Sequence, residues 1–422
     1  MKSLPFTQAE LMRFVSECPT PFYIYDEKAI RDNVKRLKRT FSWNPGFKEY
    51  FAVKATPNPF ILQIFKKEGC GVDCASETEL MLAQRCGFSG KDIMFTSNAT
   101  PAEEFIRARK MGAIINFDDI THIDFLKEYA GIPELICCRF NPGGTLEYKD
   151  KLNLNMEESK FGFTKQQLVD GFKYLMKLGV KRFGIHAQLG AHRTETEFLG
   201  SNARLLLELA LELYRRTGAR IEFINLAGGI GIPHRPDEPA ADIEAVGNYI
   251  KNAYNEVIVG GGLHPISLFT ELGIFMTGPY GYFVSSVLHV KKTFKQFIGL
   301  DASTNSFMSP ARYNDYHHIS VIGKEESEYN NTYDITGALC ENRDKFAVNR
   351  TMPSVGKGDL FVFHDAGAYA YSHSYNFNGK LRPAELLLCE DHSVRLIRRA
   401  ETAEDYFSTL DFAGLDTFTN FF

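Results

Sequence analysis

Short apolar runs alternate with amphipathic stretches along the first two thirds of the chain. The apolar runs predict strands over residues 49–53, 71–74, 93–96, 113–116, 135–140, 182–187, 221–226 and 266–270. The stretches between them carry apolar residues at helical spacing and predict helices over 61–68, 77–86, 101–111, 122–129, 166–178, 201–217 and 243–259. About eight strands, each followed by a helix over about 250 residues, are typical of a parallel (β/α)8 barrel.

The pattern changes after about residue 281, where long helical stretches stop. Apolar runs separated by turns predict strands over 284–290, 296–300, 319–322, 333–335, 360–364, 385–389 and 394–398. The fold class is therefore α/β, a TIM-like barrel joined to a C-terminal β-sandwich or β-barrel domain. We expect residues 1–27 to pack with the β domain, residues 28–280 to form the barrel and residues 281–422 to form the β domain.

Composition and charge limit the classes of function and partner that the chain can have. The chain has 422 residues, 44% hydrophobic and 24% charged, with a formal net charge of −4. With no basic tract, nucleic acid and anionic membranes are not expected partners. No apolar leader or membrane-length run occurs, and the eight cysteines are scattered, which is typical of a reduced, cytoplasmic protein. Cys70 and Cys74 lack a second ligand pair, so no metal site is expected.

Lys54 ends an apolar run and is followed directly by a turn, in the sequence YFAVKATPNP over residues 50–59. A lysine half out of water at the mouth of a strand can have a lowered pKa and attack a carbonyl. The structural alternative is a lysine whose stem lies along the strand end while its ammonium stays in water.

Glycines and a glutamate follow the last two predicted barrel strands. Gly228, Gly229 and Gly231 come after the strand at 221–226, and such a turn lets backbone N–H groups approach a phosphate. A dinucleotide site is not indicated, because the acidic residue that it needs is missing. Glu271 follows the strand at 266–270, where a carboxylate can keep a ring nitrogen protonated. The alternatives are a turn that only bends the chain and a structural ion pair.

The β region adds two more candidates. Cys340 and Glu341 stand together in a loop and offer a proton donor beside a charge, unless they form an ordinary solvated loop. Tyr369 lies in a tight turn after Asp365 and can point its hydroxyl at a ligand or pack as a structural aromatic. Together, the lysine, the glycine turn, the glutamate and the acidic loop match the needs of an aldehyde cofactor. Such a cofactor requires an amine that binds the aldehyde, a phosphate-binding turn and an acidic partner for its pyridinium nitrogen.

At this point the whole chain resembles the fold-type III pyridoxal-phosphate-dependent decarboxylases, and within them diaminopimelate decarboxylase. The motifs occur in the family order: residues 50–59, VDCASETE at 72–79, RFNPG at 139–143, SKFG at 159–162, the glycine turn, Glu271, Cys340–Glu341 and DAGAY at 365–369. The resemblance implies that Lys54 carries pyridoxal 5'-phosphate covalently. It also implies cofactor contacts from Asp73, Arg139, Gln188, Gly228, Gly229, Gly231, Glu271 and Tyr369.

The same resemblance implies a reaction and an assembly. In this family meso-2,6-diaminopimelate is decarboxylated to L-lysine, as part of lysine biosynthesis. The loop with Cys340 and Glu341 enters the active site of the other subunit, and Cys340 is the leading proton donor. The resemblance therefore implies an obligate homodimer with shared active sites.

Three departures from the family pattern fall where the family holds its substrate. Ile274 stands where the family has an arginine, in ELGI at 271–274, and Ser309 replaces a second arginine, in SPARY at 309–313. Gln188 replaces the histidine that stacks on the cofactor ring. Tyr313 and Glu341, the other contacts at the far end of the substrate, remain.

Losing one buried charge-assisted pair costs about 2–5 kcal/mol of binding free energy. Two losses should abolish ordinary diaminopimelate binding unless Arg193 or Arg312 compensates for the missing charges. The alternative is that the side chains of Arg193 and Arg312 both point into solvent and do not compensate. We expect the decarboxylase chemistry to be kept and the specificity at the far end to change. D-lysine, D-ornithine and carboxynorspermidine-like amines then become candidate substrates. The other interpretations are a non-catalytic regulatory homologue that binds pyridoxal phosphate, and a racemase.

Overall fold

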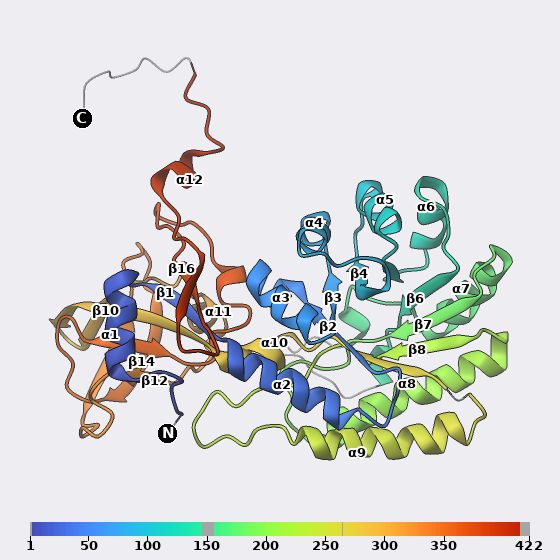
Figure 1. The fold of residues 1–422 in the computed structure, drawn as a ribbon, viewed down its shortest axis with the longest axis horizontal. Coiled ribbons are helices and arrows are strands. Elements are labelled where there is room, and N and C mark those ends of the chain that lie inside the picture. Colours follow the sequence, from blue (N-terminus) through green and yellow to red (C-terminus); the bar gives the residue numbers. More distant parts are fainter. Residues whose placement is uncertain (1, 146–155, 264, 414–422) are drawn as a thin grey trace.

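The computed structural model describes residues 2–145, 156–263 and 265–413. Two bodies lie side by side, a helix-covered barrel and a β domain, and the chain passes between them more than once (Figure 1). The predicted fold class is confirmed. Among the described residues, no helix has the length and apolar character needed to cross a membrane.

Parallel strands form the closed barrel, each paired with the next, and the last paired with the first. The strands are β2 (Lys48–Ala52), β3 (Gly71–Cys74), β4 (Ile93–Ser97), β5 (Ile114–Phe117), β6 (Leu135–Arg139), β7 (Arg182–His186), β8 (Ile221–Asn225) and β9 (Ser267–Thr270). They occur where the sequence pattern predicted them, within a residue or two. Because the strands are parallel, all their carboxyl ends meet at one rim of the barrel.

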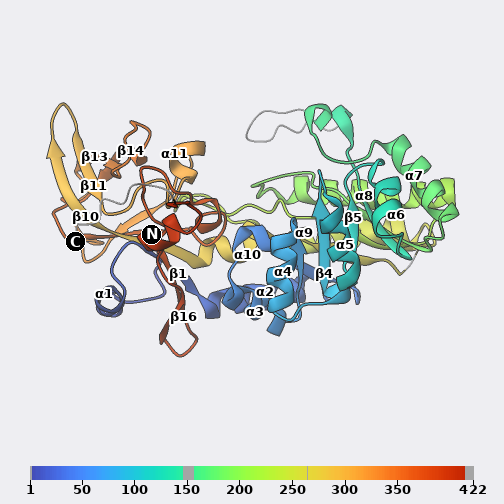
Figure 2. The same cartoon turned by 90° about the horizontal axis from the view of Figure 1, so that it is seen from above.

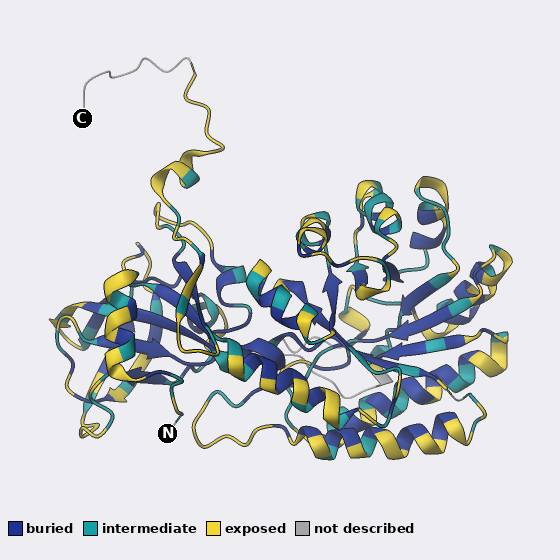
Figure 3. Cartoon of the chain, in the orientation of Figure 1, coloured by how far each residue is buried: buried dark blue, intermediate teal, exposed yellow. Residues whose placement is uncertain are grey.

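Helices cover the outside of the barrel with one apolar face inward, as the burial colours show (Figure 3). They are α2 (Glu27–Thr40), α3 (Pro59–Lys67), α4 (Glu77–Arg85), α5 (Ala102–Met111), α6 (His122–Tyr129), α7 (Lys165–Lys177), α8 (Thr196–Thr217) and α9 (Ile243–Tyr254). The start of α3 illustrates the local cause. Asn58 accepts a hydrogen bond from the N–H of Phe60 at 3.0 Å, and Pro59 takes the first helical position, so the chain turns into a helix directly after the lysine loop.

One helix begins earlier than its pattern predicted. α8 starts at Thr196 instead of residue 201. Gly200 interrupts the apolar pattern there, but a Cβ at this position would lie 2.3 Å from the ring of Tyr249 on α9. The glycine therefore permits close packing of the two helices, and tertiary contact overrides its low helix propensity.

The β domain is a nine-stranded sheet of mixed direction. Its strands are β1 (Phe22–Asp26), β10 (Gly281–Lys292), β11 (Gln296–Leu300), β12 (Ile319–Val321), β13 (Asn331–Thr336), β14 (Lys345–Met352), β15 (Leu360–Phe363), β16 (Ala384–Leu388) and β17 (Val394–Arg398). β1 lies between β10 and β16, so an N-terminal strand stands inside a sheet built from the C-terminal third of the chain. Helix α1 (Gln8–Glu17) packs Leu11 and Phe14 onto the same sheet.

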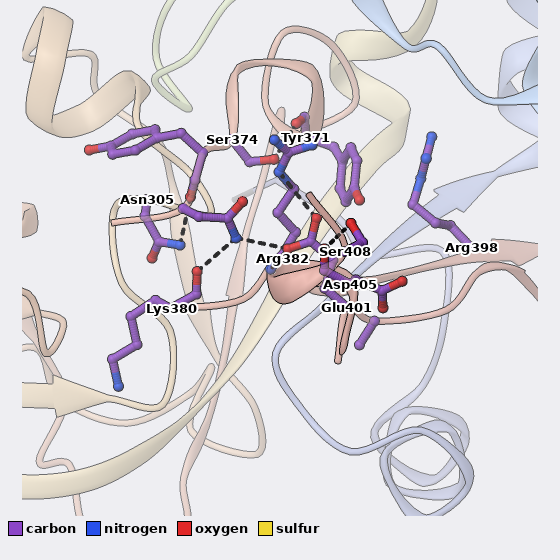
Figure 4. Close-up of polar contacts among 12 residues, drawn as sticks. Asn305, Tyr371, Ser374, Lys380, Arg382, Arg398, Glu401, Asp405 and Ser408 are labelled. Carbon is purple, nitrogen blue, oxygen red and sulfur yellow. Dashed lines mark hydrogen bonds and ion pairs between the residues drawn. The ribbon is translucent and has the colours of Figure 1, made fainter. Parts of the chain in front are cut away.

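After β17 the chain leaves the sheet and reaches the short helix α12 (Ala403–Phe407), which projects away from the rest of the molecule (Figure 1); seen from above, this end of the chain lies on the side of the β domain and not of the barrel (Figure 2). Polar contacts hold the segment that leads to this helix (Figure 4). Glu401 accepts a hydrogen bond from Asn376 at 2.9 Å and pairs with Arg382 at 3.6 Å, and Arg399 pairs with Asp405.

Candidate active site

A cavity of about 650 Å³ lies at the carboxyl ends of the barrel strands, where the barrel meets the β domain. Residues that follow β2, β6, β7, β8 and β9 line its barrel side, and residues near β12 and β15 line the other. The structure brings many of the predicted site residues to this cavity: Lys54, Arg139, Gln188, Gly228, Gly229, Glu271, Ile274, Ser309, Tyr313 and Tyr369.

Lys54 lies on the short turn η1 (Val53–Ala55) directly after β2, with its side chain 48% exposed to the cavity. Its Nζ is 3.2 Å from Oδ2 of Asp73, which is fully buried on β3. The sequence suggested a lowered pKa, and this was wrong. Burial does lower the pKa of Lys54, but the negative charges of Asp73 and Glu271, together with Tyr369, outweigh it and hold this pKa above its ordinary value.

Glu271 lies directly after β9 and is buried beneath the cavity. Asn225 donates a hydrogen bond to its Oε1 at 2.7 Å, and Nε2 of His186 is 3.5 Å from its Oε2. Burial raises the pKa of Glu271, but His186, Lys54 and the hydrogen bond from Asn225 together lower it below its ordinary value. This carboxylate therefore stays negative and can accept a proton or a hydrogen bond from a ring nitrogen above it.

The glycine turn after β8 is packed too tightly for side chains. A Cβ on Gly228 would lie 2.8 Å from the carbonyl oxygen of Glu271, and one on Gly229, whose φ is 107°, would lie 2.7 Å from the carbonyl oxygen of Gly190. Gln188 accepts a hydrogen bond from the N–H of Gly228 at 3.1 Å. The turn lies at the cavity wall, where a glycine-rich backbone suits a phosphate, but a phosphate that took the N–H of Gly228 would have to displace the Gln188 amide.

Gly231 does not line the cavity; a Cβ there would lie 2.5 Å from the backbone of His192. Arg193 holds the turn by its backbone, since its N–H donates to the carbonyl of Gly229 at 3.0 Å and its carbonyl accepts from the N–H of Gly231 at 2.7 Å. The Arg193 side chain instead pairs with Glu195 at 2.9 Å.

Arg139 and Tyr369 reach the cavity from opposite bodies. Arg139 ends β6, stacks on the ring of Phe161 at 4.1 Å and lies 3.4 Å from the Asp118 carboxylate. Burial lowers the pKa of its guanidinium. Tyr369 donates its backbone N–H to the carbonyl of Ala55 at 2.8 Å and has φ 56°, so its turn is tied to the loop that carries Lys54.

All three positions that depart from the family pattern line the cavity, Gln188 beside the glycine turn and the other two elsewhere. Ile274, on α10 (Gly273–Thr277), and Ser309, on α11 (Ser309–Tyr313), both line it, and Ser309 donates a hydrogen bond to Asp315. Arg312 does not line it; its guanidinium is 5.2 Å from the ring of Tyr313. Of the lysines and arginines that the structure describes, Lys54 and Arg139 line this cavity.

Cys340 and Glu341 lie outside the cavity of their own chain. Both are exposed, and the N–H of Cys340 donates to Oδ1 of Asn378 at 2.7 Å. Their assignment to a neighbouring active site stays a prediction.

Sequence reasoning missed three cavity residues that converge from separate segments: His234, His317 and Asp365. Burial and the neighbouring His234 lower the pKa of His317 to about 3. Burial raises the pKa of Asp365 to about 6, although Lys2 opposes this shift. His186 was noted only as one of the polar residues at the strand ends and received no role, and the structure places it beside Glu271.

A barrel with this lysine, glutamate and glycine turn at its carboxyl rim defines a class of cofactor-dependent lyase. Residues 27–278 match the family model of the pyridoxal-dependent decarboxylase, pyridoxal binding domain. The chain belongs to this family of pyridoxal-dependent decarboxylases.

Relatives and solved structures make the comparison more specific. The chain is 38% identical to Protein TabA of Pseudomonas amygdali pv. tabaci, over 95% of this chain and 93% of that protein. It is 32% identical to diaminopimelate decarboxylase of Methanothermobacter thermautotrophicus, over 94% and 93%. The structure of diaminopimelate decarboxylase from M. jannaschii in complex with L-lysine superposes with a TM-score of 0.87 at 27% identity, covering 94% and 93%. The predicted family is confirmed.

Proposed function

We propose that this chain binds pyridoxal 5'-phosphate through Lys54 and decarboxylates a free amino acid. The observation that carries the proposal is that one cavity holds the Lys54 amine, the Glu271 carboxylate and the glycine turn at Gly228 and Gly229. These groups fit the three parts of the cofactor, since an amine can bind its aldehyde, a buried anion can pair with its ring nitrogen and backbone N–H groups can hold its phosphate.

When bound, the cofactor supplies an electron sink for the bond to the departing carboxylate. The residues of the chain supply position and charge. Glu271, fixed by Asn225 and His186, holds a proton on the ring nitrogen. Asp73 keeps the Lys54 side chain directed into the cavity. Arg139 and Tyr369 add a cation and a hydroxyl on either side of the site.

The proton that replaces the departing carboxylate comes, in this proposal, from Cys340 of a second copy of the chain, with Glu341 beside it. Both residues are exposed, which is consistent with their use by a neighbour. Mixing a Lys54→Ala chain with a Glu341→Ala chain tests the shared site. If sites are shared, each mixed dimer regains one intact site, and activity recovers to about one quarter of the wild-type value. Two inactive variants that stay inactive on mixing would contradict it.

The substrate proposal follows from the far wall of the cavity. Ile274 and Ser309 present no positive charge there, and Asp315 adds a carboxylate. A second substrate carboxylate would lose about 2–5 kcal/mol for each missing charged pair. We therefore expect D-amino acids with an amine or neutral far end, such as D-lysine or D-ornithine, to be turned over better than meso-diaminopimelate. A carboxynorspermidine-like amine is a further candidate.

The cofactor assay compares Lys54, which follows β2, with Lys48, the first residue of that strand. Lys54→Ala should lose the visible absorption band of the bound cofactor, and Lys48→Ala, at the opposite end of β2, should keep it. A band retained without Lys54 would refute the assignment of that lysine. Carbon dioxide release from the substrate panel then separates a decarboxylase from a non-catalytic binder and from a racemase. Efficient lysine formation from meso-diaminopimelate would refute the changed specificity.

A further inference from the structure

Two histidines and an aspartate lie together in the cavity wall. They are separate from the ion pair that Lys54 forms with Asp73. His234 follows the glycine turn of the barrel, His317 precedes β12, and Asp365 follows β15. One nitrogen from each ring and one carboxylate oxygen all lie within 4.8 Å of one another. All three residues line the cavity, so the group that they form opens onto the proposed active site.

The environment of His317 fixes which of its nitrogens is available. The ring is 4% exposed, and its Nδ1 lies 2.9 Å from the backbone carbonyl oxygen of His364. Because a carbonyl oxygen only accepts, Nδ1 must carry the hydrogen, and Nε2 keeps a free lone pair. Within the described part of the chain, this buried Nε2 has no hydrogen-bond partner. An imidazole held in this way by a backbone carbonyl is the form in which histidine binds metals.

Asp365 already attracts a cation. Its carboxylate is buried, pairs with the ammonium of Lys2 and lies 3.8 Å from Nδ1 of His234. Its φ of 59° is in the left-handed region, a strained conformation that a non-glycine residue adopts when the surroundings impose it. Lys2 also donates to the carbonyl of Pro233 at 2.5 Å. A lysine near the N-terminus thus occupies the position that a metal ion would take beside this carboxylate.

We propose that His234, His317 and Asp365 form a binding site for a divalent transition metal, with Zn²⁺ the best match. Two imidazoles and one carboxylate are the donor set that zinc prefers, and three protein ligands leave one coordination position open. In a zinc site, ligand atoms about 2.1 Å from the ion lie about 3.4 Å apart. The three side chains must therefore draw closer, and Lys2 must move away. The sequence pattern gave no sign of this site, because its members lie far apart along the chain.

The open coordination position faces the cavity that also contains Ile274 and Ser309. Its ligand would be an anionic group, such as the second carboxylate of a dicarboxylic amino acid. A metal ion there would return a positive charge to a wall that has lost two arginines of the family pattern. This step rests on the proposed decarboxylase activity and would reverse, when Zn²⁺ is bound, the specificity proposed for the metal-free site, whereas metal binding itself rests on neither.

The test is a titration of the chelator-treated holoenzyme with Zn²⁺, followed by calorimetry, and with Co²⁺, followed by its visible absorption. One ion per chain should bind. His234→Gln and His317→Gln should each weaken binding by more than about tenfold, and His289→Gln, which removes an exposed histidine, should leave it unchanged. Lys2→Met should strengthen binding, because the competing ammonium is gone. A misfolded variant cannot gain affinity, so this result is specific.

Binding far below one ion per chain, or equal binding by the wild type and both histidine variants, overturns the site. Because the readout is metal binding, failure here leaves the decarboxylase proposal standing. The second step is tested by turnover of meso-diaminopimelate with and without Zn²⁺. A lower KM with Zn²⁺, absent in His317→Gln, supports the carboxylate ligand, and a KM that Zn²⁺ does not change overturns it.

Discussion

Asp73→Asn should lower the pKa of Lys54 in the cofactor-free protein. The substitution keeps the shape of the side chain and removes one buried negative charge 3.2 Å from Nζ of Lys54. Asp73 makes the largest contribution among the groups that raise this pKa, whereas burial acts in the opposite direction. Without Asp73, burial is opposed mainly by Tyr369 and Glu271, so the neutral amine becomes more populated near neutral pH.

The separation of the charges gives the size of the effect. At 3.2 Å, the Coulomb energy is about 5 kcal/mol with an effective dielectric constant of about 20, and about 1.3 kcal/mol in bulk water. Lys54 is 48% exposed, so screening by solvent places the effect well below the upper value. Since one pKa unit corresponds to about 1.4 kcal/mol, the pKa of Lys54 should fall by about one to three units.

The rate at which the cofactor-free protein captures pyridoxal phosphate, followed by visible absorption across a pH series, measures this shift, because only the neutral amine attacks the aldehyde. The rise of the rate with pH should move to lower pH in Asp73→Asn. Asp92→Asn is the matched control, because Asp92 pairs with Lys48 at the other end of β2. A profile that stays in place in Asp73→Asn, or moves to higher pH, would show that Asp73 does not set the charge of Lys54.

Three further predictions concern the glycine turn, Ile274 and Glu49, a buried residue of β2 that accepts hydrogen bonds from Thr270 and Leu272. Burial raises the pKa of Glu49 to about 8, so between about pH 4.5 and pH 8 the folded protein keeps a proton that the unfolded chain has released. The free energy of unfolding should therefore fall as the pH rises through this range. Chemical denaturation across the pH series should show a larger fall for the wild type than for Glu49→Gln. Gly229→Ala should cost about 1–3 kcal/mol of stability and weaken cofactor binding in a spectroscopic titration, whereas Gly218→Ala, at a positive φ with open space around it, should affect stability less and leave cofactor binding intact. Ile274→Arg should improve kcat/KM for meso-diaminopimelate relative to D-lysine by at least about tenfold. An unchanged ratio would show that the residue at this position does not contact the far end of the substrate.

The barrel was predictable because its strands are continuous apolar runs separated by clear helical periods. Two strands of the β domain, the internal β1 and the edge strand β14, were harder. β1 joins the sheet from the other end of the sequence, and its residues FYIYD are buried almost throughout, so no alternation marks it. In β14, Val348, Asn349 and Thr351 are exposed and Lys345 and Arg350 are half-buried, so the strand shows no regular apolar alternation. Both strands are defined by partners that lie far away in the sequence.

The residues of the site were predictable where they follow strands, and their charges were not. Register places Asp73 of β3 beside Ala52, the last residue of β2, and so brings its carboxylate to the lysine that follows. The lowered pKa expected for Lys54 considered only desolvation, which a strand mouth suggests, and missed the buried carboxylates that outweigh it. The group of Lys2, His234, His317 and Asp365 depends on the contact between barrel and β domain, which no local pattern encodes.

The two sides of the cavity tolerate change to different degrees. On the barrel side, Glu271 is held by Asn225, His186 and the backbone of Ala227, and the glycine turn has no room for a Cβ, so nearly any substitution there disturbs several contacts at once. Away from these contacts, Ile274 and Ser309 line the cavity, so a change of residue there alters the surface that a substrate meets, although Ile274 also packs against the core. Two of the three differences from the family, Ile274 and Ser309, stand at such positions and should alter which amino acid is held, whereas the third, Gln188, contacts the glycine turn.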